Sequence, residues 1–219
     1  MSDCCREDIM DVKMYIENRK QKKYSEKLFK ELCFYWLLLA GEGRADLYML
    51  NSKLGVSERT LFRYAKELNE CGLVPKLSKR VLRADDKTAD FYSFDPRVYR
   101  QYERQYLKAH KDDRWSSYDF FQFAEDYPKR NAKESSGQSR LYRCGVLLAS
   151  NQYTAEPLEY LIDEDEKIPE GLEVFEFEGK EYAFYVNDLC EDIYENLSLR
   201  TLQRDLRVVK DVIIYMFEE

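Results

Sequence analysis

The chain has 219 residues, of which 44% are hydrophobic and 35% are charged, and its formal net charge is −7. This length can hold one large or two small domains without disulfides or metals, and the composition excludes a disordered or a membrane protein. The six cysteines show no Cys-x-x-Cys spacing and there is one histidine, so we expect no metal site and no cofactor.

The charge is distributed unevenly along the chain. Residues 1–137 carry 27 Lys and Arg against 23 Asp and Glu, whereas residues 138–219 carry 8 against 19. This asymmetry predicts two halves with different partners. The longest apolar stretch, Cys33 to Ala40, is far shorter than the roughly 20 residues that span a bilayer, and the N-terminus lacks a signal-peptide pattern. We therefore expect a cytoplasmic protein without a membrane partner.

The N-terminal part is predicted to be helical. Asp3 to Lys23 has a polar helical pattern, and Ser25 can cap a second helix that stops at the Gly-x-Gly of residues 41–43. Because this Gly-x-Gly follows a helix, we interpret it as a helix stop and not as a phosphate loop. The second helix has apolar residues around its circumference, which predicts a place at the centre of the core.

Two helices separated by a tight turn come next. A leucine spacing predicts a short helix over residues 47–54 that ends at Gly55, and Ser57 caps a longer helix that runs to Leu68. Two strands, residues 77–83 and 91–94, then form a hairpin joined by residues 84–89. This order predicts a winged helix-turn-helix in which the hairpin of residues 76–94 is the wing.

Two further helices are predicted before the middle of the chain. Asp95-Pro96 opens a helix, and Ser116 or Ser117 begins the next. The first of these helices carries a tyrosine stripe at Tyr99, Tyr102 and Tyr106. Such a stripe packs internally more often than it serves a partner.

A polar segment that contains Ser-Ser-Gly predicts a domain boundary. The expected organisation is an N-terminal domain over residues 1–128, a linker over residues 129–138, and an acidic C-terminal domain over residues 139–219. In the C-terminal domain we expect a helix over residues 140–149, a helical stretch near Leu158, a solvated acidic loop from Asp163 to Glu166, a hairpin over residues 172–186, a short helix capped by Asn187, and a helix capped by Ser198.

The two halves share a sequence motif. Ser57-Glu-Arg-Thr-Leu-Phe-Arg63 and Ser198-Leu-Arg-Thr-Leu-Gln-Arg204 both read Ser-x-Arg-Thr-Leu-x-Arg. A match at the start of two expected helices indicates a duplicated module. The predicted fold is therefore mainly α with small β-hairpins, an α+β chain of tandem winged-helix-like modules.

The first module carries candidate DNA-binding residues on its longer helix and its wing. A recognition helix needs a packed inner stripe, basic outward residues and a capped N-terminus that faces phosphate. The candidates are Ser57, Arg59, Thr60, Arg63, Lys66, Lys79, Arg80, Arg83 and Lys87. Alternatively, the arginines form only the solvated face of a helix in a module that packs against protein.

The second module carries a similar basic stripe in an acidic setting. Its candidates are Ser198, Arg200, Thr201, Arg204 and Arg207. The surrounding negative charge repels a polyanion except at this stripe. The following segment, Val208 to Phe217, is apolar enough to form an interface. Dimerisation or protein docking therefore fits this module better than DNA binding does.

The motif residues resemble known families. Val56-Ser57-Glu58-Arg59-Thr60, followed by Arg63 and Leu68, resembles the V-S-x-R-T-x-x-R-x-x-x-x-L pattern of DeoR-type bacterial winged helix-turn-helix modules. The segment from Ser198 to Leu206 is similar to the same signature in regulators with WYL domains, although no WYL or sugar-phosphate sensor domain is visible. The resemblance implies DNA recognition by the second helix of each pair.

These observations favour a bacterial transcription regulator that binds double-stranded DNA as a homodimer. The tandem arrangement also resembles plasmid replication initiators with two winged helices. A third hypothesis is an interaction scaffold without DNA binding, whose acidic C-terminal domain recruits a protein. No nucleophile elbow, phosphate loop or carboxylate pair is visible, so we expect no enzyme.

Overall fold

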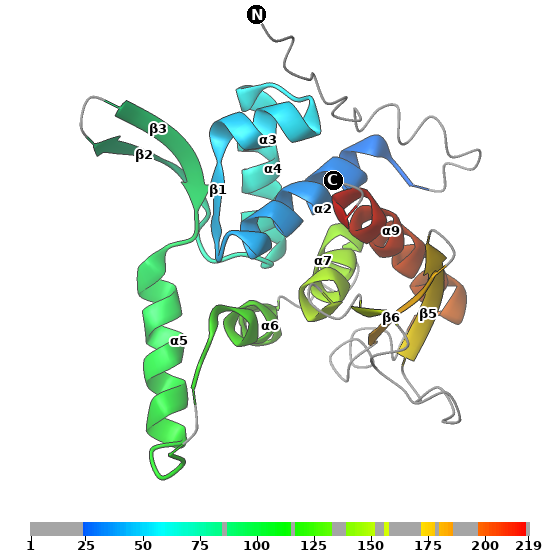
Figure 1. Ribbon diagram of the computed structural model, residues 1–219. Helices are drawn as coiled ribbons and strands as arrows, with labels where there is room; N and C mark the ends of the chain where they lie inside the picture. The colour runs from blue at the N-terminus through cyan, green and yellow to red at the C-terminus, as the bar shows by residue number, and fades with distance from the viewer. Residues whose placement is uncertain are drawn as a thin grey trace, which may run out of the picture.

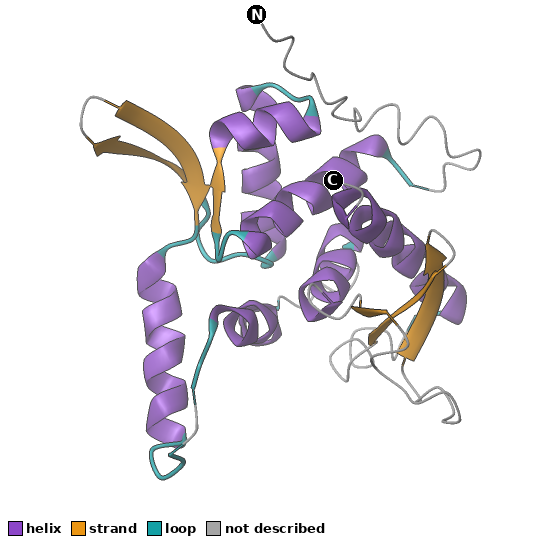
Figure 2. Ribbon diagram, viewed as in Figure 1, coloured by secondary structure: helices purple, strands orange, loops and turns teal. Residues whose placement is uncertain are grey.

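The computed structural model describes residues 24–84, 87–114, 117–132, 139–151, 156–157, 172–177, 180–185 and 197–217. Its elements are α2 (Glu26–Ala40), β1 (Arg44–Asp46), α3 (Leu47–Leu54), α4 (Glu58–Cys71), β2 (Ser78–Ala84), β3 (Lys87–Ser93), α5 (Pro96–Ala109), α6 (Phe120–Asn131), α7 (Arg140–Asn151), β4 (Glu156–Pro157), β5 (Leu172–Phe177), β6 (Lys180–Tyr185) and α9 (Leu199–Phe217). Helices dominate, and the strands form two small antiparallel sheets ordered β1-β3-β2 and β4-β6-β5 (Figures 1 and 2). The prediction of a mainly α chain with small β-hairpins is confirmed.

Helix α2 lies at the centre of the molecule. Every residue from Leu28 to Leu39 is buried, because α2 contacts α3, α4, α7 and α9 (Figure 1). The ring of Phe34 meets Tyr92 of β3 edge-on at a centroid distance of 5.3 Å, and Phe29 meets Tyr215 of α9 at 5.6 Å. The all-round apolar pattern of this helix therefore gives a buried helix, as expected.

A single hydrophobic cluster joins residues from both halves of the chain, including α2 and α4 from the first and α7 and α9 from the second. The two expected domains, residues 1–128 and 139–219, thus share one hydrophobic core. That they fold separately stays a prediction. Helix α6 continues to Asn131, so it extends into the segment expected to be a linker.

The apolar end of α9 is wrongly predicted as an interface. Its buried side chains are Val208, Val209, Val212, Ile213, Ile214 and Tyr215. They pack inside the chain, where α9 contacts α2 and α7. Sequence periodicity shows that a face is apolar, but it does not show whether the partner of that face belongs to the same chain.

The hairpin is longer than expected and has an additional strand. Strand β3 begins at Lys87, and its pairing with β2 runs to Ala84 opposite Lys87, whereas the sequence predicted a loop over residues 84–89. The hydrogen bonds between paired strands involve backbone groups only, so the far end of a projecting hairpin can form without alternating apolar residues. The sequence therefore carried no strand pattern there. The short strands β1 and β4 were also missed, because three and two residues carry no periodicity.

Helices α5 and α6 pack through aromatic residues. Tyr99 and Tyr102 contact the ring of Phe123 edge-on, each at a centroid distance of 5.3 Å, which supports the internal role of the tyrosine stripe. Helix α6 begins at Phe120 and not after Ser116 or Ser117 as predicted. The side chain of Asp119 caps it by accepting a hydrogen bond from Gln122 N at 2.9 Å, and Asp caps helices as well as Ser does.

Several predicted segments lie outside the described residues. They are the helix over residues 3–23, the stretch near Leu158, the acidic tract from Asp163 to Glu166, and the short helix capped by Asn187. Within the described chain, none of the helices combines the length and the apolar character that crossing a membrane requires.

A buried carboxyl group links α2 to α4. The side chain of Glu31 is 4% exposed, and its Oε1 lies 3.4 Å from Lys27 Nζ, which also pairs with Glu67 of α4. Burial, followed by a hydrogen bond shared with Glu67, raises the pKa of Glu31 from 4.5 to about 8. The folded chain therefore holds a proton on Glu31 that the unfolded chain releases at lower pH.

We expect Glu31→Gln to flatten the dependence of stability on pH. Because the pKa of Glu31 is higher in the folded state, the wild-type free energy of unfolding falls as pH rises from 4.5 to about 8. The variant lacks this loss and should be more stable by about 4 kcal/mol at pH 8. Urea unfolding across this range measures both slopes, and parallel curves for the two proteins would contradict the assignment.

Candidate nucleic-acid interface

Helices α3 and α4 form a compact pair with a tight turn. Asp46 caps α3 by accepting a hydrogen bond from Met49 N at 3.0 Å. The helix ends at Gly55, whose φ of 57° lies in the left-handed region that glycine adopts without strain. Leu54 and Leu61 are fully buried on either side of this turn. The bounds of α3 agree with the predicted helix, and α4 continues three residues beyond the predicted end at Leu68.

Ser57 caps α4, as predicted. Its hydroxyl oxygen accepts a hydrogen bond from Thr60 N at 3.4 Å and lies 3.1 Å from Thr60 Oγ1. Both candidates therefore have a local structural role at the start of the helix. The first backbone N–H groups of a helix have no partner within the helix, and they give its N-terminus a partial positive charge that favours a bound anion.

The outward face of α4 carries three basic residues around an aromatic one, and the exposed carboxylates Glu58 and Glu70 lie near its two ends. Arg59, Phe62, Arg63 and Lys66 are exposed, whereas Leu61 and Leu68 point into the core. Arg59 and Arg63 form no ion pair within the described chain, and the Arg63 guanidinium lies 5.7 Å from the Tyr64 ring centroid. Lys66 pairs with Glu70 at 3.6 Å, a solvent-exposed contact that contributes little. The two arginines are therefore the side chains best placed for an external anion.

Lys79 has a partner already. Its Nζ lies 2.6 Å from Glu58 Oε1 on α4 and 2.6 Å from Asp90 Oδ2 on β3. The hydrogen bond to Asp90 and then that to Glu58 raise the pKa of Lys79 above its ordinary value. Lys79 thus ties the hairpin to the first turn of α4, and this role differs from the phosphate contact expected of it.

The other wing candidates lie elsewhere. Arg80 is exposed and follows Lys79 in β2, so it projects from the opposite face of the sheet, away from α4. The side chains of Arg83 and Lys87 lie outside the described residues. The structure therefore brings Ser57, Arg59, Thr60, Arg63 and Lys66 together on one helix and places Arg80 apart from them.

Four exposed apolar residues of α3, α4 and β2 were not predicted from the sequence. Tyr48 on α3 is 83% exposed and Phe62 on α4 is 65% exposed, and Val81 and Leu82 on β2 are also exposed. Phe62 could have been found from helical spacing, because it lies three residues after Arg59 and between the two basic positions. Single exposed hydrophobic residues are common on protein surfaces, and the adjacent Val81 and Leu82 project from opposite faces of the hairpin.

The start of α9 repeats the geometry of the α4 cap. Ser198 accepts a hydrogen bond from Thr201 N at 3.3 Å, and the two hydroxyl oxygens lie 3.0 Å apart. Arg200, Arg204 and Arg207 are exposed. The shared motif therefore corresponds to a shared local structure, and the outward basic stripe is present on both helices.

Helix α9 differs from α4 on its inward face. Asp205 is 1% exposed and accepts hydrogen bonds from Arg140 Nε at 2.8 Å and Arg143 Nε at 2.7 Å, both from α7. Tyr64 holds the corresponding position of α4 when the two motifs are aligned. A buried carboxylate with two guanidinium partners thus fixes α9 on α7.

Comparisons with known proteins add no family assignment. No protein-family model matches the sequence, and no curated protein is significantly similar to it. In the described part of the chain, no cluster of three or more His, Cys, Asp or Glu side chains is arranged to hold a metal ion.

We expect Asp205→Ala to destabilise the protein by about 3 kcal/mol, since it leaves the buried guanidinium group of Arg143 and the half-buried one of Arg140 without their carboxylate. Arg207→Ala on the exposed face of the same helix is the matched control and should change stability by less than about 0.5 kcal/mol. Urea unfolding measures both. Similar small losses in the two variants would show that the Asp205 pairs do not hold α9 in place.

Proposed function

We propose that this protein binds double-stranded DNA as a sequence-specific regulator of transcription, with α4 in the major groove. The element order α2-β1-α3-α4-β2-β3, with strands ordered β1-β3-β2, is that expected of a winged helix-turn-helix. The observation that carries the proposal is the outward face of α4. A capped helix start lies there beside a projecting hairpin (Figure 1), together with two arginines that form no ion pair with any residue the structure describes.

The chemistry of this face suits a duplex. An arginine can donate two hydrogen bonds to a guanine edge or pair with a phosphate, and an aromatic ring can contact a thymine methyl group. Arg59, Phe62 and Arg63 offer these groups within little more than one turn of one helix. Lys79, held by Glu58 and Asp90, supports the hairpin as a wing.

A homodimer follows from the small footprint of one module. One recognition helix reads only a few base pairs, and a symmetric pair doubles the site. We expect a dimer at micromolar concentration in sedimentation velocity. A monomer across the whole concentration range, with and without duplex, would remove the dimer from the proposal and leave DNA binding to be judged separately.

Specific observations favour two other functions. The exposed Tyr48, Phe62, Val81 and Leu82 suit a scaffold that binds protein. The matching caps at Ser57 and Ser198 suit a replication initiator that uses two helices on DNA. Charge reversal on α4 and on α9 distinguishes these functions, because only a helix that contacts DNA should lose affinity for the duplex when its charge is reversed.

We expect Arg59→Glu with Arg63→Glu to weaken binding of a random duplex by at least about a hundredfold, because phosphate contacts are lost and like charges are introduced. Wild-type affinity should fall about a hundredfold between 50 and 200 mM salt if about four phosphates are contacted. Fluorescence anisotropy with a labelled duplex measures both effects.

Lys108→Glu with Lys111→Glu is the matched control, since it makes the same change of charge at the exposed end of α5. It should retain most of the affinity. Arg200→Glu with Arg204→Glu tests the second helix, and a large loss there would favour the initiator. A flat salt response, or wild-type affinity in the Arg59 and Arg63 double variant, would favour the scaffold.

A further inference from the structure

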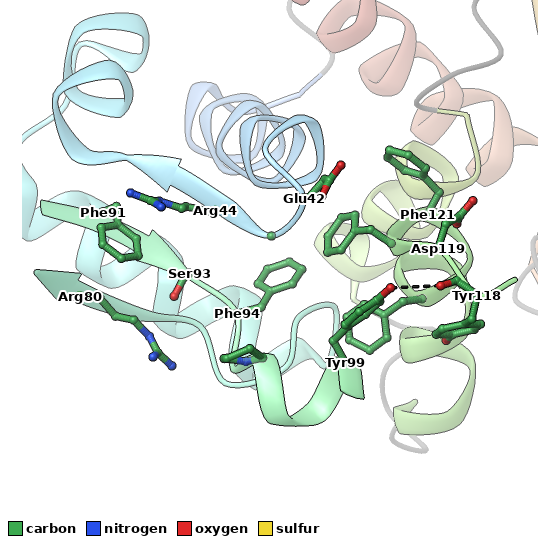
Figure 3. A pocket seen from close by; sticks show the side chains of 14 residues that line it. Glu42, Arg44, Arg80, Phe91, Ser93, Phe94, Tyr99, Tyr118, Asp119 and Phe121 are labelled. Atoms are coloured by element: carbon green, nitrogen blue, oxygen red, sulfur yellow. Dashed lines mark hydrogen bonds between the residues drawn. The ribbon is translucent and has the colours of Figure 1, made fainter. Parts of the chain in front are cut away.

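A pocket lies on the face of the β1-β3-β2 sheet opposite to α4. Its volume is about 710 Å³, within the range of small-molecule sites. The sheet provides one wall, and the starts of α5 and α6 provide the other (Figure 3). None of the residues proposed to contact DNA on α4 takes part in it.

The middle of the pocket is aromatic. Phe94 and Phe120 stack with a centroid distance of 5.9 Å, and Tyr99 lies 6.4 Å from Phe120. Gly43 lies against the two phenylalanine rings, and its φ of 83° and the close approach of the Phe94 ring leave no room for a side chain. These faces offer a planar molecule the ring-to-ring contacts that aromatic groups prefer.

Two arginines flank the central strand at one end. Arg44 of β1 is paired with Ser93, and Arg80 of β2 is paired with Phe91, so both project from the same face on either side of β3. The Arg44 guanidinium carbon lies 4.0 Å from the Phe91 ring centroid, which holds the group flat on the ring. Neither arginine forms an ion pair with a residue the structure describes. Their N–H groups are therefore available to an anion.

Two acidic groups also line the pocket. Figure 3 shows Asp119 at the start of α6, away from Arg44 and Arg80, and Glu42 in the turn between α2 and β1, between Asp119 and Arg44. One oxygen of Asp119 is used in the cap of α6, and the carboxylate retains further acceptor capacity. The pocket thus has a cationic end, an aromatic middle and an end that accepts hydrogen bonds.

We propose that this pocket binds an elongated aromatic acid, with its anionic group on Arg44 and Arg80 and a hydroxyl donor directed at Glu42 or Asp119. A carboxylate or phosphate pairs well with guanidinium groups, and the acceptor end disfavours a second anion. The proposal does not rest on DNA binding, because a small ligand is measured on the protein alone. Arg80 is the one residue shared with the expected DNA contacts.

The probe is para-hydroxycinnamate, which has a carboxylate, a planar body and a phenol in line. By isothermal titration we expect saturable binding with a Kd below about 1 mM. The neutral para-hydroxycinnamyl alcohol should bind at least about tenfold more weakly, since it lacks the charge. Cinnamate, which lacks the phenol, should bind several-fold more weakly.

Arg44→Gln and Arg80→Gln should each weaken binding of para-hydroxycinnamate about tenfold. Arg59→Gln on α4 is the matched control and should leave the Kd unchanged. Arg80 is exposed and not engaged in the core, so its variant tests the site even if Arg44→Gln unfolds. No saturable binding, equal binding of the alcohol, or a wild-type Kd for Arg80→Gln would overturn the proposal.

Discussion

The burial of α2 on all sides is the constraint on which the rest of the structure depends. The helix has no solvent face between Leu28 and Leu39, so its burial requires partners from both halves of the chain. Tyr92 from the first sheet and Tyr215 from α9 meet the same helix through Phe34 and Phe29. Helices α3 and α4 are consequently not independent of the second half, because they pack on the same core.

Local signals in the sequence were sufficient for most helices and for the second hairpin. Caps such as Ser57 and Asp95, and stops such as Gly55, act through neighbouring backbone groups, so they can be recognised without knowledge of the fold. The length of β3 and the place of α9 depend on groups distant in the sequence. The buried pairing of Asp205 with Arg140 and Arg143 has no sequence signal of its own. The pattern of polar and apolar residues therefore predicted where the helices and strands are better than it predicted which of them pack together.

The sequence predicted the arrangement of the candidate site on α4 but not on the hairpin. Helical spacing placed Arg59 and Arg63 on the outward face of α4, where the structure has them. The same reasoning grouped Lys79 and Arg80 as neighbouring wing cations, although adjacent residues of a strand project from opposite faces. Lys79 turns toward α4 and Arg80 toward the aromatic pocket. Counting basic residues thus assigned too many of them to the surface beside α4. It did not predict that Arg44 and Arg80 lie on the same, opposite face of the sheet.

The ammonium group of Lys79 has a consequence beyond bracing the hairpin. Glu58 lies in the first turn of α4, where a bare carboxylate would compete with a phosphate for the helix N-terminus. Lys79 pairs with both Glu58 and Asp90 and therefore offsets part of their negative charge. In the proposed complex, this lysine would shape the potential that DNA meets without touching the duplex. A side chain can thus influence recognition by reducing the negative charge at the start of a helix without contacting the ligand.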